Sequence, residues 1–160
     1  MKNRILCPTR GGKASYANQD RAIALAKERE AELLFMYVSN VKFLGLTSLP
    51  FIVDIETELD EMGEFILTMA QERADKAGVQ AEITVERGVF HEVLKAVVQE
   101  HKISTVVLGS SKEGTGFTTE EYVQKLGETI SREMGVEFIV LRDGEVQKVF
   151  KPQGSGSSVA

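Results

Sequence analysis

Two short segments combine glycines, hydroxyl groups and a cation, which are residue types that bind phosphate. Residues 9–15 follow one apolar run and contain Arg10 and a Gly-Gly pair, and residues 109–116 follow another and contain Lys112. Glycines let backbone N–H groups approach an anion, and a following helix N-terminus adds partial positive charge. Tight turns and helix caps need the same residue types even where no ligand binds. Each segment alone is therefore as consistent with a purely structural role as with ligand binding. Because both segments follow strands that would be neighbours, we expect a phosphate-bearing ligand between them.

The established phosphate motifs fit these segments poorly. Residues 109–114 have the glycine spacing of a P-loop, but Thr115 and Gly116 stand where Lys and Ser/Thr are required. No Gly-x-Gly-x-x-Gly dinucleotide motif occurs in the chain. Residues 10–15 resemble the Ser-Gly-Gly-x-Asp-Ser loop of ATP pyrophosphatases, but the first Ser and the Asp are missing. We therefore do not expect the chemistry of any of these classes.

The chain offers little for catalysis or for a metal. Its two histidines, His91 and His101, flank one short helix without the spacing of metal ligands. Cys7 lies inside an apolar strand without a basic neighbour, which is typical of a small buried hydrophobe. The acidic run at 54–61 complements the dipole at the start of a helix. We expect no catalytic residue, no metal site and at most weak ATP hydrolysis.

Composition bounds the class of protein. The chain has 160 residues, 42% of them hydrophobic and 27% charged, which suits one folded domain and excludes wholesale disorder. Its 24 acidic residues outnumber its 19 basic ones, for a net charge of −5, which argues against a nucleic-acid-binding surface. One cysteine excludes an internal disulfide framework, and no stretch approaches the ~18 apolar residues that cross a bilayer. We expect a cytoplasmic protein with no nucleic-acid or membrane partner.

Apolar runs and helical periodicity alternate along the chain. Buried strands are predicted at 5–7, 33–38, 103–108 and 136–141, and a strand near a sheet edge at 81–85, where apolar and polar residues alternate. Apolar residues three and four positions apart predict helices between these strands, ending near 26, 77, 98 and 134. This βαβαβαβαβ order predicts an α/β fold, a three-layer, doubly wound sheet with helices on both faces.

Local signals place several ends of these elements. Ser15 would cap the first helix, a capping box of Thr118 and Glu121 would begin the last, and Gly78 and Gly135 would end theirs. The connection at 40–54 is unusually apolar for a loop. Asp143-Gly144 is a turn signal, after which residues 146–150 alternate loosely enough for a short extra strand. We expect an α/β domain over 1–150 and a flexible tail over 151–160.

Five segments, in this order and spacing, carry a resemblance over residues 2–142. Residues 4–9 and the Gly-Gly pair resemble an ILVPTDGS opening, 34–38 an LLHV strand, and 85–88 a third strand with its glycine. Residues 106–111 are similar to IVMGS and 138–142 to a closing VLVVR. Together they resemble the universal stress protein family. The resemblance implies a five-stranded parallel sheet of order 3-2-1-4-5 and a homodimer through the last strand, 136–141, whose apolar edge carries no guarding Lys or Pro.

In one branch of that family the resemblance also implies ATP or AMP bound between the first and fourth strands. Nucleotide-binding members have an Asp where this chain has Arg10, and a Gly-x-x-Gly, nine-residue, Gly-Ser/Thr motif. Here Gly109 begins that motif, Lys112 replaces its second glycine, and Gly127 comes too close to the last strand to align. Val38 and Gly88 match positions that line the adenine pocket.

The predicted nucleotide-binding residues share a place at a strand's carboxyl end or in the loop that follows it: Pro8, Thr9, Arg10, Val38, Gly88, Gly109, Ser110, Ser111, Lys112, Gly114, Gly116, Thr118 and Thr119. Phosphates would lie against 109–116 and the start of the next helix, with Glu113 the one nearby carboxylate, and the base would lie towards Val38.

These observations predict a universal-stress-type regulatory module in the stress response. It would be cytoplasmic and homodimeric, would bind ATP, AMP or another phosphate-bearing anion, and would have a regulatory protein as a further partner. The alternative is a nucleotide-free dimeric interaction domain that uses the apolar loop at 41–53. A weak ATPase or phosphotransferase is disfavoured, because no carboxylate is placed to hold magnesium at either loop.

Overall fold

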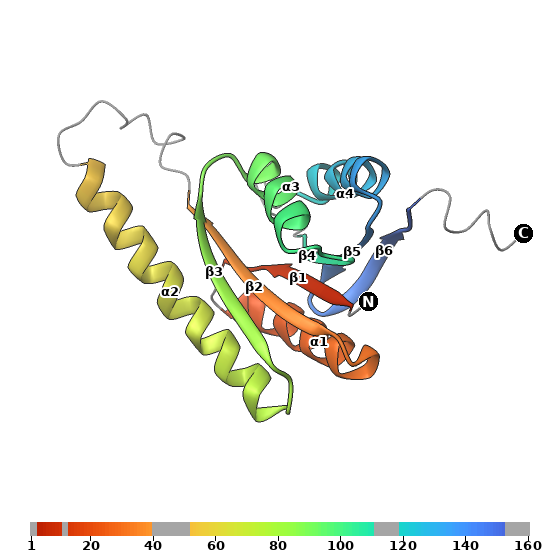
Figure 1. Ribbon diagram of the computed structural model, residues 1–160, viewed down its shortest axis with the longest axis horizontal. Helices are drawn as coiled ribbons and strands as arrows, with labels where there is room; N and C mark the ends of the chain where they lie inside the picture. The colour runs from red at the N-terminus through yellow and green to blue at the C-terminus, as the bar shows by residue number, and fades with distance from the viewer. Residues whose placement is uncertain (1–2, 11–12, 40–51, 111–118, 153–160) are drawn as a thin grey trace, which may run out of the picture.

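The computed structural model describes residues 3–10, 13–39, 52–110 and 119–152, and shows a six-stranded sheet between two pairs of helices (Figure 1). The strands are β1 (Arg4–Pro8), β2 (Glu32–Ser39), β3 (Ala81–Arg87), β4 (Thr105–Gly109), β5 (Glu137–Arg142) and β6 (Glu145–Phe150). The helices are α1 (Lys13–Arg29), α2 (Ile52–Lys76), α3 (Phe90–Glu100) and α4 (Glu120–Met134). Within these described ranges, no helix has the length and apolar content to cross a membrane.

The sheet has the order β3-β2-β1-β4-β5-β6, and its first five strands run parallel. The predicted α/β class and the order 3-2-1-4-5 are therefore confirmed, as is the place of β3 at an edge. The predicted count of five strands is wrong by one, because β6 pairs antiparallel with β5. Asp143 and Gly144, at φ 52° and 80°, form the tight turn that brings β6 back, and Asp-Gly is a pair that tolerates two positive φ angles.

The hairpin of β5 and β6 corrects the expectation of an unguarded edge at 136–141. Each of the residues Phe138 to Arg142 has a partner in β6, so β5 is an interior strand of the sheet. The turn is also attached to α1: Asn18 Oδ1 accepts a 2.8 Å hydrogen bond from the Gly144 N–H, and Arg21 Nε donates to the Gly144 carbonyl at 2.8 Å. The chain itself thus covers the edge that was expected to dimerise.

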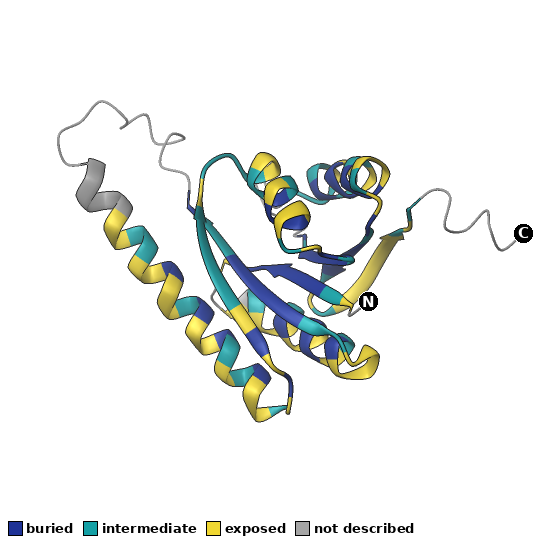
Figure 2. Cartoon of the chain, viewed as in Figure 1, coloured by how far each residue is buried: buried dark blue, intermediate teal, exposed yellow. Residues whose placement is uncertain are grey.

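Helices α1 and α2 cover one face of the sheet, and α3 and α4 cover the other (Figure 1). The strands β1, β2 and β4 are buried along most of their length (Figure 2). One apolar core lies on each face of the sheet. Phe35 fills the core beneath α1 and α2, and Phe138 fills the core beneath α3 and α4. This two-sided burial explains the continuous apolar runs in the central strands.

Two of the predicted helix starts are corrected. Helix α1 already includes Lys13, so Ser15 lies in its first turn and is not its cap. Helix α4 is capped by Thr119, whose hydroxyl accepts a 3.3 Å hydrogen bond from the Tyr122 N–H, whereas Thr118 lies outside the described residues. The predicted stops are confirmed, since Gly78 and Gly135 follow α2 and α4 at φ 80° and 68°.

Helix α2 buries a different face from the one that its apolar periodicity emphasises. The buried positions are Gly63, Leu67, Ala70 and Ala74, which follow one another about one turn apart on one side. Gly63 is needed there, because a Cβ atom would lie 2.5 Å from Cδ1 of the Tyr37 ring. The small residues Gly63, Ala70 and Ala74 let the helix approach the sheet closely, and the larger apolar side chains of α2 other than Leu67 lie on another side.

Candidate functional site

The candidate site lies where the sheet changes its winding direction. Strand β1 is flanked by β2 on one side and β4 on the other, and the chain leaves the carboxyl ends of β1 and β4 towards helices on opposite faces. In open parallel sheets, ligands bind at such a point. The structure places the described predicted residues at this one edge: Pro8, Thr9, Arg10, Val38, Gly88, Gly109, Ser110 and Thr119. Ser111, Lys112, Gly114, Gly116 and Thr118 lie outside the described residues.

Thr9 joins the end of β1 to α1 and β2. Its side chain is buried and accepts a 2.8 Å hydrogen bond from Nε2 of Gln19, which is 2% exposed. Its N–H donates to the Met36 carbonyl at 2.8 Å. The hydroxyl of Thr9 can still donate one hydrogen bond. The main role of Thr9 is to fix the position of the chain at the end of β1.

Ser110 has both of its donors committed to β5. Its N–H and its hydroxyl donate to the Leu141 carbonyl at 2.7 and 3.2 Å, and the residue is buried. A phosphate would have to displace one of these bonds to be bound by Ser110 directly. The residue therefore fixes where the segment after β4 begins.

Gly109 provides room for a side chain from α1. A Cβ atom at this position would lie 2.3 Å from Nδ2 of Asn18, the same residue that accepts the Gly144 N–H. The packing of Asn18 thus accounts for this glycine without a ligand. Asn18 was missed in the sequence, because a single Asn in an alanine-rich helix carries no distinctive spacing.

Val38 and Gly88 form an apolar part of the edge on the β2–β3 side. Val38 is half-buried against the core beneath α3 and α4. Gly88 has a φ of 136°, which favours glycine, and its N–H donates to the Ser39 carbonyl at 3.1 Å. A flat apolar group such as an adenine ring would find a Val side chain and a bare backbone here.

A charged group beside this apolar part comes from α2 and β3. The Asp60 carboxylate accepts a 2.9 Å hydrogen bond from Arg87 Nε and a 3.3 Å one from Ser39 Oγ. Asp60 belongs to the acidic run at 54–61, which the sequence relates to the helix dipole, and it also joins α2 to the ends of β2 and β3. Its partner could not be found from spacing, because Arg87 is distant in sequence.

The beginning of α4 carries a carboxylate that corrects the expectation of a site with Glu113 as its one nearby acid. Glu120 lies in the first turn, next to the capping Thr119. Its carboxylate pairs with Arg142 at 3.3 Å and accepts a 3.3 Å hydrogen bond from Gln124. Arg142 thus offsets the charge that would otherwise repel a phosphate at this helix N-terminus.

Arg10 is an exposed cation at this edge, directly after Thr9. Its side chain makes no hydrogen bond or ion pair with another described residue, which leaves it available for an anion. By contrast, Gly127 lies in the middle of α4, where a Cβ would come within 2.8 Å of Phe138 and 2.9 Å of Phe150. That glycine serves packing and lies away from any phosphate loop.

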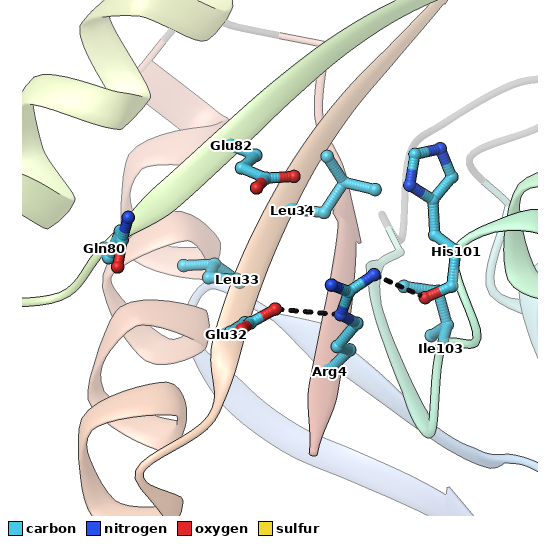
Figure 3. A pocket seen from close by; sticks show the side chains of 8 residues that line it. All are labelled: Arg4, Glu32, Leu33, Leu34, Gln80, Glu82, His101 and Ile103. Atoms are coloured by element: carbon cyan, nitrogen blue, oxygen red, sulfur yellow. Dashed lines mark hydrogen bonds and ion pairs between the residues drawn. The ribbon is translucent and has the colours of Figure 1, made fainter. Parts of the chain in front are cut away.

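A separate small pocket of about 50 Å³ lies at the opposite, amino edge of the sheet (Figure 3). Arg4 lines it between Glu32 and His101, donating to Glu32 at 2.8 Å and to the His101 carbonyl at 3.0 Å. Its other lining residues are Leu33, Leu34, Gln80, Glu82 and Ile103. The pocket is far smaller than the ~300 Å³ or more typical of ligand sites, so we assign it a structural role.

The described residues include no group of three or more His, Cys, Asp or Glu side chains that could hold a metal ion. Cys7 is 3% exposed in the core beneath α1 and α2, and burial raises the pKa of its thiol to about 12. A thiol of that kind is protonated at neutral pH and is a poor nucleophile.

Comparison with known proteins gives consistent results. The model of the universal stress protein family matches residues 1–118. Universal stress protein YxiE of Bacillus subtilis is 34% identical over 119 residues, which cover 69% of this chain and 80% of that protein.

Solved structures of low sequence identity share the fold. Universal stress protein UspA from Lactobacillus plantarum has a TM-score of 0.70 at 16% identity, over 88% of this chain and 97% of that one. A universal stress protein in complex with cAMP has a TM-score of 0.59 at 18% identity, over 88% and 97%. A family member from Arabidopsis thaliana with AMP bound has a TM-score of 0.55 at 14% identity, over 87% and 90%.

Proposed function

Since the chain belongs to the universal stress protein family, we propose that it is a regulatory module of the stress response that binds an adenine nucleotide, ATP or AMP. The observation that carries the proposal is the switch point between β1 and β4, with exposed Arg10 on one side and the capped N-terminus of α4 on the other. Relatives of the same fold were solved with cAMP and with AMP, which supports the ligand class. We expect the protein to work in the cytoplasm.

In the proposed complex the base lies towards Val38 and Gly88, where the edge of the sheet is apolar and one residue has no side chain. The phosphates lie towards residues 109–116 and Thr119, because a helix N-terminus attracts negative charge. Arg10 and Lys112 supply the positive charge. In this assignment the charge of Lys112 takes the place of the backbone N–H contact that the second glycine of the family motif would provide.

A second candidate function rests on a different observation. Ser110 and Thr9 use their donors or acceptors within the fold, and Glu120 lies in the first turn of α4. These features favour the alternative of a nucleotide-free interaction domain. Its expected contact loop at 41–53 lies almost entirely outside the described residues. The support for this candidate therefore comes from Thr9, Ser110 and Glu120 at the site.

Calorimetry on protein stripped of nucleotide tests the proposal, with ATP, AMP and inorganic phosphate as separate titrants. Lys112→Ala should weaken nucleotide binding by about 1–3 kcal/mol, the range for a charge-assisted hydrogen bond. Lys27→Ala is the matched control, because it removes the same charge from the exposed last turn of α1. The control should leave the affinity unchanged.

Arg10→Asp separates two roles of Arg10. The substitution introduces the Asp that nucleotide-binding members of the family share at this position. It should tighten nucleotide binding if Arg10 itself makes no contact with the ligand. It should weaken binding if Arg10 has taken over contact with phosphate. The absence of heat with all three titrants would refute the proposal and leave the interaction domain as the better reading.

A further inference from the structure

Helix α2 carries an apolar stripe that the described part of the chain does not cover. The stripe consists of Leu59, Met62, Phe65, Ile66 and Met69, which we call the outer stripe. Phe65 is 66% exposed, Met62 48% and Met69 40%, and the other two are half-buried. Clustered large apolar side chains of this exposure mark an interaction surface, whereas single ones are ordinary.

The outer stripe has the spacing of a helix–helix seam. Leu59, Met62, Ile66 and Met69 follow one another at intervals of three and four, and Phe65 lies beside them. The face of α2 packed against the sheet is a different one, made of Gly63, Leu67, Ala70 and Ala74. Helix α2 forms one flank of the molecule, and its side away from the sheet is largely exposed (Figure 2). A second helix could therefore lie along this side without displacing any core contact.

The charges at the two ends of the outer stripe have opposite signs. At about 100° per residue, Glu58 lies on the same side of the helix at its amino-terminal end, and Arg73 and Lys76 at its carboxyl-terminal end. Arg73 also pairs with Asp20 at 2.7 Å and lies over the Tyr16 ring, 4.3 Å from its centroid. Tyr16 is 36% exposed and continues the apolar surface onto α1.

This arrangement is self-complementary for an antiparallel copy. With a two-fold axis between positions 65 and 66, Met62 faces Met69 of the second copy and Glu58 faces its Arg73. The same two contacts occur twice, as an isologous interface requires. We propose that two copies of this chain associate through the outer stripe of α2, with the helices antiparallel.

The extent of the surface sets the expected strength. From Glu58 to Lys76 the helix rises about 27 Å at 1.5 Å per residue, one helix wide. Such a contact is smaller than the roughly 800 Å² per partner of a standard interface, so we expect a dissociation constant in the micromolar range. The edge of the sheet offers a competing surface, because Val146 and Val149 of β6 are 47% and 39% exposed.

Sedimentation velocity over a concentration series tests the proposal on the full chain. The wild type should shift from monomer to dimer, and Phe65→Glu should raise the dissociation constant about tenfold or more, because it places a carboxylate in an apolar contact. Val146→Glu is the matched control: it introduces the same charge at an exposed apolar position on β6. It should leave the dissociation constant unchanged.

Cysteine cross-linking tests the geometry separately. Buried Cys7 does not compete, so single cysteines can be introduced as Met62→Cys and Met69→Cys. A mixture of the two variants should form a 62–69 disulfide faster than either variant forms a disulfide with itself. Preferential 62–62 and 69–69 bonds would overturn the antiparallel arrangement.

Three results would overturn the interface itself. The wild type could remain monomeric throughout the series. Val146→Glu could dissociate a dimer that Phe65→Glu leaves intact, which would assign the contact to β6. Phe65→Glu could lower the melting temperature of a monomer by several degrees, which would show that the chain's own segments cover the stripe.

Discussion

Glu137 at the start of β5 joins three elements at the amino edge of the sheet. Its carboxylate accepts hydrogen bonds from Arg29 at 2.6 Å and from the Thr105 hydroxyl at 3.1 Å. Partial burial raises the pKa of this carboxyl, but the hydrogen bond and charge of Arg29 and the hydrogen bond of Thr105 outweigh burial. The net pKa of Glu137 lies below its ordinary value of 4.5.

This lowered pKa predicts a pH-dependent contribution to stability. Because the pKa is lower in the folded than in the unfolded chain, the contribution is complete above about pH 4.5 and is lost as the pH falls through the folded value. Glu137→Gln should therefore be less stable than wild type at pH 7, by about 1–2 kcal/mol given that Arg29 is one-third exposed. Urea unfolding should show this difference shrinking towards pH 3.5.

Glu133→Gln provides the comparison, because Glu133 pairs with Lys95 on the surface, where its side chain is 45% exposed. It should change the free energy of unfolding less at pH 7. A Glu137→Gln difference that stayed constant from pH 7 to pH 3.5 would contradict the role assigned to Arg29 and Thr105.

Among the elements, β6 depends on α4 for its position. Phe150 at the end of β6 packs against the core beneath α3 and α4, next to the backbone of Gly127. A Cβ at 127 would lie 2.8 Å from Phe138 Cδ1 and 2.9 Å from Phe150 Cδ2. Phe138 is fully buried and has no room to withdraw. The helix and the hairpin therefore meet through a glycine.

Gly127→Leu should destabilise the protein by about 1–3 kcal/mol, the usual cost of overpacking a core, despite a gain of roughly 0.5–1 kcal/mol in helix propensity. Lys125→Leu, at an exposed position of the same helix, should stay within about 0.5 kcal/mol of wild type. Urea unfolding measures both. A Gly127→Leu variant as stable as wild type would mean that Phe150 does not pack as described.

For the molecule as a whole, the main consequence of β6 is to cover an apolar strand. Residues 138–141 of β5 are buried and carry no charge, so uncovered they would form an edge that readily pairs with another chain. Gly144 of the hairpin turn is held by Asn18 and Arg21 of α1, which keeps β6 in place. In the intact chain β5 is therefore an interior strand, paired with β4 and β6.

A chain ending at Arg142 should therefore associate more strongly than the full chain, because it exposes the edge of β5. Light scattering over a concentration series would show a larger mass for the truncated form. A chain ending at Pro152 keeps β6, so it should have the same number of copies per particle and the same melting temperature as the full chain. Residues 153–160 carry no large apolar side chain except Val159. Equal masses for both truncations would contradict the protective role of β6.

The order of strands and helices was readable from the sequence, because the signals that set it are local. Continuous apolar runs mark strands with both faces covered, and Gly78 and Gly135 mark helix ends through their own backbone angles. The positions of Arg10, Val38 and Gly88 at one edge followed from the same pattern, since parallel strands all end on one side. Family resemblance supplied the order of the strands.

Contacts between distant segments could not be read in that way. The buried face of α2 is set by Tyr37, whose ring requires Gly63, and so the side with the stronger apolar periodicity faces outwards. The edge of β5 is covered because α1 and α4 hold the hairpin, and Gly109 is a glycine because Asn18 lies over it. Each depends on a partner tens of residues away, and hydrophobic periodicity records how apolar a face is, not which neighbour will cover it.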